Sequence, residues 1–435
     1  MGHRRLWLSG GICAAVLVAP AAAQADSPDT SAISSQFGAP ASSSASAVDD
    51  FYASRPGALV WLRDADTKTA AWKLPDILRR APIDGLDNGA QLAAAVEAAI
   101  ARGQPEDDRV ISNAWVSYVR TLRRPVEGVS YGDTALRPQV PSANEILADA
   151  RRAGSLSAHV DEIAAVNPFY SQLREASIAQ GAAADPRVRA TLDRLRLIPA
   201  TGRAILVDVA SAHLFMLENG KPVDSMKVIV GKTSSPSHLL ASTIHYVTFN
   251  PYWNIPDDVA RGRVAPVVLK RGVSYLKAAR YETWSALGSK GERIDADSVD
   301  WKAVVAGEAP VYLRQLPGDA NMMGAMKFGF ANPFDIFLHD TPKKQLFAKD
   351  KRTLSMGCIR LEHADVLARW LLGREPVPPS SEPEQHVQLD KGVPVYVTSL
   401  TATVSDGQLA FGEDVYGLDA GLPQTAAVSP TTTAN

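Results

Sequence analysis

The stretch HDTPKKQLFAKDKRTLSMGCIRLE, residues 339–362, holds the most informative chemistry of the chain. His339 ends the run FDIFLHD, whose alternation of apolar and polar residues is typical of a half-buried strand. Cys358 begins the next strand-like run, CIRLE. The polar segment between the two runs is long enough to fold back, so we expect His339 and Cys358 to meet across neighbouring strands of a sheet.

A cysteine and a histidine that meet in this way suit covalent acyl transfer. An imidazole beside a thiol raises the fraction of reactive thiolate and can return a proton to a leaving amine. Gly357 permits a close approach of the backbone, so its amide and that of Cys358 would bind the oxyanion of the attacked carbonyl. Arg360 shares a strand face with Cys358, and its guanidinium suits a substrate carboxylate or carbonyl, or orders the cysteine loop. Ser355 would hydrogen-bond within that loop.

Each of these residues also has a plainer interpretation. Taken alone, His339 is a satisfied core histidine at a strand end, Arg360 is a surface strand residue, and Cys358 is a small buried hydrophobe. The joint pattern favours catalysis. A lone cysteine has Gly before it, Arg after it and a histidine on an upstream strand.

Residues 1–25 indicate a cleaved export signal. A basic start precedes the apolar run 11–18, which is too short to span a bilayer, and residues 23–25 form a small-x-small cleavage pattern. An uncleaved membrane anchor is the alternative. Cys13 would leave with the signal, so Cys358 would stand unpaired in an oxidising compartment, which we expect to be the periplasm.

The composition and the residue spacing exclude several classes of protein. The 435 residues carry a formal charge of −2, which leaves no nucleic-acid footprint, and 46% of them are hydrophobic, as in a globular protein of two or three domains. A serine hydrolase lacks its G-x-S-x-G motif, and papain-like peptidases place the cysteine before the histidine. We expect no metal and no cofactor, because no metal-site spacing occurs among His213, His238, His245 and His363.

The periodicity changes from helical to strand-like near residue 200. Apolar residues recur at helical spacing in segments such as 89–103 and 107–124, whereas AILVDVA at 204–210 precedes a hairpin signal at Asn219-Gly220. This pattern predicts an α+β chain. The expected divisions are a signal peptide at 1–25, a disordered leader at 26–48, a helical scaffold domain at 49–200, a mainly β catalytic domain at 201–412 with an insertion at about 257–310, and a disordered tail at 413–435.

The catalytic motif resembles the signature of the YkuD-type L,D-transpeptidases, in which a strand-ending His precedes S-x-G-C-[IV]-R. The stretches FNPYWNIP (249–256), NMMGAMKFGFANPFDIFLHDTP (321–342) and DFYASRPGALVW (50–61) are similar to the large, scaffold-bearing Gram-negative branch of that family. The resemblance covers roughly residues 49–400. It implies a helical scaffold followed by a catalytic domain with a capping insertion over the active site.

The resemblance also implies a reaction. Cys358 would attack the amide between the third and fourth residues of a peptidoglycan stem peptide, release D-Ala and pass the acyl group to an amine of a second stem. His339 would act as base and then as acid, oriented by a backbone carbonyl, and Arg360 would complete the motif. Carbapenem β-lactams would be inhibitors. The implied substrate groove consists of Tyr252, Trp253, Asn254, Asn321, Lys327, Phe337 and Ser355. For Trp253 and Phe337, core packing is the alternative.

Three departures from the branch leave alternatives open. The chain has no room for a separate peptidoglycan-binding module, Phe337 stands where Tyr is usual, and Met356 replaces a small or polar residue. Links between two third residues (3-3) are the default, and links from the first residue (1-3) stay open. An L,D-carboxypeptidase that hydrolyses the same acyl-enzyme is a rival, and a wall-binding protein with a silent site is another.

Overall fold

The computed structural model describes residues 44–286 and 291–419. The predicted export signal and most of the predicted leader therefore lie outside the described residues. Residues 44–48, which we expected to be disordered, are helical, and Val48 is fully buried. In the two described ranges, no helix combines the length and the apolar character that a membrane crossing requires.

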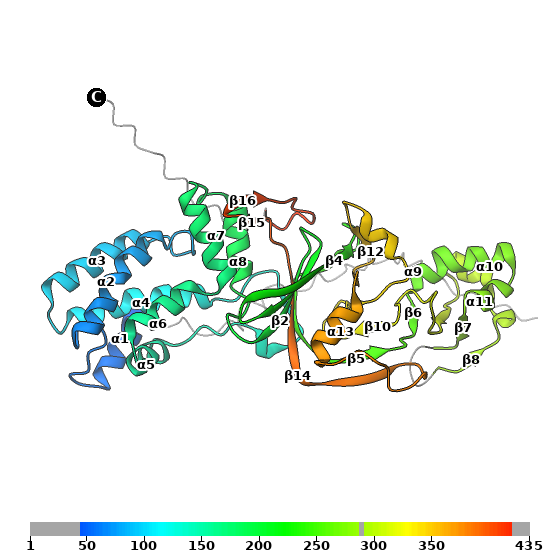
Figure 1. Cartoon of the computed structure of the whole chain (residues 1–435), viewed down its shortest axis with the longest axis horizontal. Coiled ribbons are helices and arrows are strands. Elements are labelled where there is room, and N and C mark those ends of the chain that lie inside the picture. The colour runs from blue at the N-terminus through cyan, green and yellow to red at the C-terminus, as the bar shows by residue number, and fades with distance from the viewer. Residues whose placement is uncertain (1–43, 287–290, 420–435) are drawn as a thin grey trace, which may run out of the picture. The chain divides into compact units, whose positions relative to one another are not determined.

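The first half of the described chain is helical (Figure 1). Asn167 and Asp185 are each followed by proline, which is a sequence signal for a helix start, and each side chain caps its helix by accepting a backbone N–H. The buried rings of Trp61 and Trp115 meet edge to face at 5.9 Å between centroids. The helices are α1 (Ser44–Ala53), α2 (Ala65–Arg80), α3 (Gly89–Arg102), α4 (Asp107–Arg123), α5 (Ala143–Arg152), α6 (Leu156–Ala165), α7 (Pro168–Ala179) and α8 (Pro186–Leu195).

The second half forms a mixed sheet that closes on itself, because β14 pairs with both β2 and β5. Its order is β5-β10-β11-β13-β4-β3-β2-β14, and helix α13 (Ala364–Leu372) follows β13. The strands are β2 (Arg203–Asp208), β3 (His213–Glu218), β4 (Lys221–Gly231), β5 (Leu240–Phe249), β10 (Met326–Phe328), β11 (Leu338–His339), β12 (Thr353–Ser355), which pairs with β4, β13 (Ile359–Leu361) and β14 (Gln385–Thr398). The predicted α+β fold, with a helical half before a sheet-rich half, is confirmed.

The insertion is a small layer of its own and is wider than we predicted. A second sheet, in the order β6-β9-β7-β8, consists of β6 (Trp253–Ile255), β9 (Tyr312–Gln315), β7 (Tyr281–Trp284) and β8 (Arg293–Ile294). The short helices α9 (Asp257–Val259), α10 (Ala265–Arg271), α11 (Ser274–Ala278) and α12 (Trp301–Ala306) complete it. It has a separate apolar core that includes Trp301 and Leu313. It separates β5 from β10 in the sequence, although these two strands pair directly.

The helical half also contributes to the catalytic sheet. Between α4 and α5, strand β1 (Ser130–Tyr131) pairs in parallel with β5. The next residue, Gly132, packs so tightly that a Cβ there would lie 1.7 Å from the carbonyl oxygen of Ala331. Buried apolar residues of the helices and of the sheet, among them Leu206 and Tyr396, form one cluster.

The C-terminal segment corrects a second boundary. After the hairpin of β15 (Ala402–Ser405) and β16 (Gln408–Phe411), residues 413–419 are ordered by contacts with the rest of the chain. Asp419 pairs with Arg194 at 2.6 Å, and the Tyr416 hydroxyl donates to the carbonyl of Gly231 at 2.6 Å. The expectation that disorder begins at residue 413 is therefore wrong. Residues 420–435 lie outside the described part.

Candidate active site

Neighbouring strands bring the predicted catalytic residues to one face of the sheet. In the parallel register of β11 and β13, Leu338 lies opposite Ile359 and His339 lies opposite Arg360. Cys358, one residue before Ile359, therefore shares a face with Arg360, and it is a diagonal neighbour of His339. The intervening Leu338 and Ile359 point to the opposite face and are fully buried in the apolar core.

The same row of cross-strand neighbours continues onto β10, where Lys327 lies opposite His339. The imidazole is thus flanked by two cations, Lys327 on one side and Arg360 on the other. Burial and the charge of Arg360 lower the pKa of His339 to about 3, so the ring is neutral at ordinary pH.

A backbone carbonyl determines the tautomer of His339. Its Nδ1 lies 2.5 Å from the carbonyl oxygen of Asp340. Because a carbonyl oxygen can only accept, Nδ1 carries the ring proton and Nε2 presents a lone pair. This is the arrangement of a general base, oriented by a carbonyl and not by a carboxylate.

Cys358 rests as a neutral thiol. Burial raises the pKa of the half-buried thiol above its ordinary value. Its Sγ lies 3.7 Å from the carbonyl oxygen of Asp335, to which it donates. The sequence had led us to expect an imidazole that increases the thiolate fraction. Burial of both groups acts against that effect, because it raises the pKa of the thiol and lowers the pKa of the imidazole.

Asp335 and the turn around it were not predicted as part of the site. Asp335 has a φ of 51°, in the left-handed region that Asp tolerates better than most residues. The side-chain oxygen of Asn332 accepts the N–H groups of Phe334 at 3.1 Å and Ile336 at 3.0 Å, which holds this turn. The signal available in the sequence was Asn332 followed by proline, a common turn opening.

The loop at Cys358 contains both predicted oxyanion donors, the N–H groups of Gly357 and Cys358, and only the first is hydrogen-bonded. Gly357 has a φ of 112°, a conformation that L residues with side chains rarely adopt. Its N–H donates to the Ser355 hydroxyl at 3.2 Å. In the described part of the chain, no hydrogen bond occupies the N–H of Cys358. Ser355 is buried, and its hydroxyl stabilises the loop by accepting the N–H of Gly357. It is therefore not exposed to a substrate groove, where we had expected it.

Arg360 is a half-buried cation without a counter-charge. Among the residues that the structure describes, no carboxylate lies within ion-pair distance of its guanidinium, and its Nε has no hydrogen-bond partner. Burial lowers its pKa from the usual value, and Arg263 of the insertion contributes in the same direction. An unpaired guanidinium beside a thiol is a suitable contact for a substrate carboxylate or carbonyl.

A cavity of about 870 Å³ adjoins this face. Lys327 and Phe337 line it, together with Asp335, whose carbonyl accepts the thiol proton. Cys358, His339 and Arg360 are not among its lining residues. One wall comes from the helical half, through Asp133 and its neighbours. The Asp133 carboxylate accepts the hydroxyl of Thr243 at 2.6 Å, and this bond contributes most to lowering the pKa of Asp133. No sequence motif had pointed to this wall.

Two of the other predicted groove residues belong to the inner packing of the chain. Asn321 is buried, and its Nδ2 donates to the carbonyls of Pro251, Gln315 and Leu316, so the prediction that it binds substrate is wrong. Trp253 packs against the core of the insertion, which was the alternative interpretation.

The remaining two lie away from the 870 Å³ cavity. The ring of Tyr252 is covered by the guanidinium of Arg314 at 3.9 Å, and its N–H donates to Glu384 at 2.7 Å. Asn254 is exposed and lines a different cavity, of about 460 Å³, in the insertion. The structure thus gathers the catalytic set with Lys327 and Phe337, and leaves Tyr252 and Asn254 outside it.

Comparison with known proteins identifies both halves of the chain. Residues 202–397 match the family model described as the L,D-transpeptidase catalytic domain, and residues 46–176 match the one described as the Scaffold domain. The second half of the chain is thus similar to the catalytic domain of the L,D-transpeptidases. The resemblance inferred from the sequence motifs is therefore confirmed.

Individual proteins are similar to the chain at low sequence identity. A protein of Haemophilus influenzae whose name assigns it to the L,D-transpeptidases is 27% identical over 325 residues. The match covers 70% of this chain and 64% of the relative. Among solved structures, a point mutant of the Enterococcus faecium L,D-transpeptidase is 13% identical, with 46% of this chain and 51% of that chain covered and a TM-score of 0.24. The L,D-transpeptidase from Mycobacterium smegmatis is 11% identical, with 45% of this chain and 58% of that chain covered and a TM-score of 0.22.

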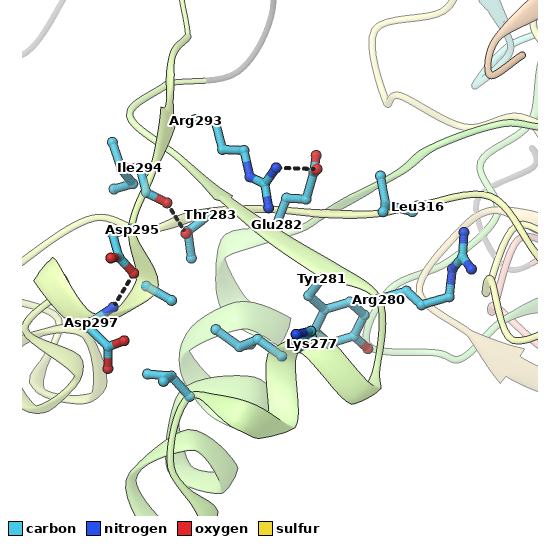
Figure 2. A pocket seen from close by; sticks show the side chains of 13 residues that line it. Lys277, Arg280, Tyr281, Glu282, Thr283, Arg293, Ile294, Asp295, Asp297 and Leu316 are labelled. Atoms are coloured by element: carbon cyan, nitrogen blue, oxygen red, sulfur yellow. Dashed lines mark hydrogen bonds and ion pairs between the residues drawn. The ribbon is translucent and has the colours of Figure 1, made fainter.

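The insertion has a cavity of its own, of about 700 Å³ (Figure 2). Its lining mixes both signs of charge, because it includes Lys277 and Arg280 as well as Asp295. Glu282 is already paired with Arg314 at 2.9 Å. Neither Cys358 nor His339 lines this cavity, and within the described residues no cluster of metal-ligating side chains occurs.

Proposed function

We propose that this chain is a peptidoglycan L,D-transpeptidase that acts through a Cys358 acyl-enzyme. The observation that carries the proposal is the placement of Cys358 and His339 as diagonal neighbours on one face of the sheet, with Nδ1 of His339 held by the carbonyl of Asp340. The cavity beside Lys327 and Phe337 supports binding of an extended peptide. Export to the periplasm, from the sequence, would bring the enzyme to its substrate.

The first half-reaction forms a thioester. As the sulfur of Cys358 attacks the carbonyl of the third stem residue, its proton passes to Nε2 of His339. The C–N bond to the fourth residue then breaks, and the imidazolium returns the proton to the departing amine of D-Ala. The low pKa of His339 makes the imidazolium a strong acid, which favours this return.

The second half-reaction transfers the acyl group. A side-chain amine of a second stem attacks the thioester and gives its proton to Nε2 of His339. The C–S bond breaks, the sulfur recovers the proton, and a new amide joins the two stems. During both attacks the N–H of Cys358, which no hydrogen bond of the described residues occupies, and the cation of Arg360 would stabilise the oxyanion.

The test is incubation of the purified protein with muropeptide monomers, beside a Cys358→Ala variant, with products sequenced by tandem mass spectrometry. Dimers made by wild type alone support the proposal, and their fragmentation distinguishes 3-3 from 1-3 links. Shortened monomers without dimers would assign an L,D-carboxypeptidase. If neither protein changes monomers or intact wall and Cys358 gains no carbapenem mass, the site is silent and the proposal is wrong.

A further inference from the structure

We propose that Ser237 and Tyr416 are positioning residues that hold the oxyanion donor of Cys358 in place. Ser237 lies in the loop between β4 and β5, and Tyr416 lies in the segment that follows the C-terminal hairpin. The proposal rests on the acyl transfer proposed above, because an oxyanion donor matters only to such a reaction.

Ser237 contacts the peptide unit that precedes the nucleophile. Its side chain is fully buried, and its hydroxyl donates to the carbonyl oxygen of Gly357 at 2.5 Å. The same hydroxyl accepts the N–H of Gly231 at 3.0 Å. The hydroxyl proton is directed at Gly357, because a carbonyl oxygen can only accept, and one of the two lone pairs of the hydroxyl accepts the N–H of Gly231.

This contact determines where the N–H of Cys358 points. The carbonyl of Gly357 and the N–H of Cys358 belong to one planar trans peptide, in which C=O and N–H point in opposite directions. Since the carbonyl is directed at Ser237, the N–H is directed away from Ser237. Gly357, with its φ of 112°, lacks the steric preference that would otherwise favour one orientation of the peptide. The serine hydroxyl supplies that preference.

Tyr416 holds the loop that carries Ser237. Its hydroxyl donates to the carbonyl of Gly231 at 2.6 Å and accepts the N–H of Ser237 at 3.3 Å. One phenol thus ties together the two ends of the segment 231–237. Gly231 is also a close-packed point, because a Cβ there would lie 2.2 Å from the carbonyl oxygen of Ser235. Residues beyond the matched catalytic domain, which ends at 397, therefore hold the segment whose Ser237 contacts Gly357.

Two reactions of the same thiol separate positioning of the donor from a general structural role. Acylation of Cys358 by a carbapenem passes through a tetrahedral oxyanion, whereas alkylation by iodoacetamide does not. In the full mature chain, Ser237→Ala is expected to slow acylation by at least ~10-fold and to leave the alkylation rate unchanged. Tyr416→Phe, which keeps the ring, is expected to slow acylation in the same direction by a smaller factor.

The matched control is Ser177→Ala. Ser177 is also fully buried and its hydroxyl donates to a backbone carbonyl, that of Leu173 at 2.7 Å, but it lies in helix α7. Both rates should equal those of wild type, and thermal melting should show all variants folded. Acylation that stays unchanged in Ser237→Ala and Tyr416→Phe, or acylation and alkylation that fall together, would overturn the positioning role alone. A wild type that no carbapenem acylates, and that makes no dimers, would overturn the proposed function as well.

Discussion

At the scale of single residues, the site combines a thiol and an imidazole that are both neutral at rest. Desolvation raises the pKa of Cys358, while desolvation and the neighbouring Arg360 lower the pKa of His339 to about 3. Both shifts favour the neutral forms of the two groups, so under the proposed mechanism the proton would move as the carbonyl is attacked. Such a pair reacts slowly with simple electrophiles and rapidly with a substrate that the cavity aligns.

The titration of Cys358 tests this arrangement. Alkylation needs the thiolate, and a raised pKa means that the thiolate fraction still increases about tenfold per pH unit between roughly pH 6 and pH 9. His339 is already in its base form above a pH of about 3, so carbapenem acylation should show no inflection near the ordinary imidazole pKa. Rates followed by intact-protein mass spectrometry check both expectations. A plateau of alkylation below pH 7 would indicate a thiolate–imidazolium pair instead.

A second pair of variants tests the corrected role of Asn321. Asn321→Ala removes three donated hydrogen bonds and the one accepted from Met323 at 2.7 Å, all in a buried setting. We expect a loss of about 2 kcal/mol or more in unfolding free energy, seen as a lower Tm. Lys327→Ala, at the cavity, should leave Tm unchanged and raise KM for stem peptides. The reverse pattern would restore Asn321 to the substrate groove.

At the scale of elements, strand β1 is the feature that joins the two halves of the chain at the site. It pairs with β5, and the residues that follow it line the cavity beside Lys327 and Phe337. The Scaffold domain therefore contributes a wall of this cavity in addition to its own helical core. The insertion, by contrast, approaches the site through the charge of Arg263 near Arg360.

One methyl group added at Gly132 should displace the cavity wall that follows β1. Gly132→Ala places a Cβ 1.7 Å from the carbonyl oxygen of Ala331, so the wall or the facing loop has to shift. We expect weaker binding of stem peptides and slower acylation, measured by isothermal titration and by mass spectrometry. Gly154→Ala is the control in the same half, because no atom lies within 4 Å of its Cβ position. Equal behaviour of the two variants would show that this wall does not contact substrate.

At the scale of the whole molecule, the C-terminal segment links the helical half to the cysteine loop. Asp419 accepts from the buried Arg194 of α8, and Tyr416 binds the backbone beside Ser237. Thr401 adds a hydrogen bond to Asp419 at 2.6 Å. Contacts of one short segment thus reach both halves of the chain.

Two truncations measure the contribution of this segment. A chain that stops after Gly412 loses Tyr416 and leaves Arg194 buried without its partner, which costs about 3 kcal/mol or more. We expect a lower Tm and slower carbapenem acylation. A chain that stops after Asp419 keeps these contacts and should match the full length in both measurements. A shorter chain that behaves like wild type would show that residues 413–419 are dispensable.

The sequence by itself determined what depends on local pattern. The change of period near residue 200, the proline-led helix starts and the Asn219-Gly220 turn predicted the order of helices and strands, because these signals act within a few residues. The strand that ends in His339 and the run that begins at Cys358, joined by one connection, predicted that these two residues lie on neighbouring strands.

Only the tertiary structure decided which side chains face the cavity and which are buried and hydrogen-bonded within the fold. In the sequence, Asn321 and Lys327 look equally suitable as substrate contacts. In the structure, Asn321 is buried and binds backbone carbonyls, whereas Lys327 lines the cavity. The lowered pKa of His339, the wall beyond β1 and the contacts of Tyr416 all depend on groups far apart in the chain. Desolvation and long-range hydrogen bonds are properties of the packed chain, and no spacing of residues encodes them.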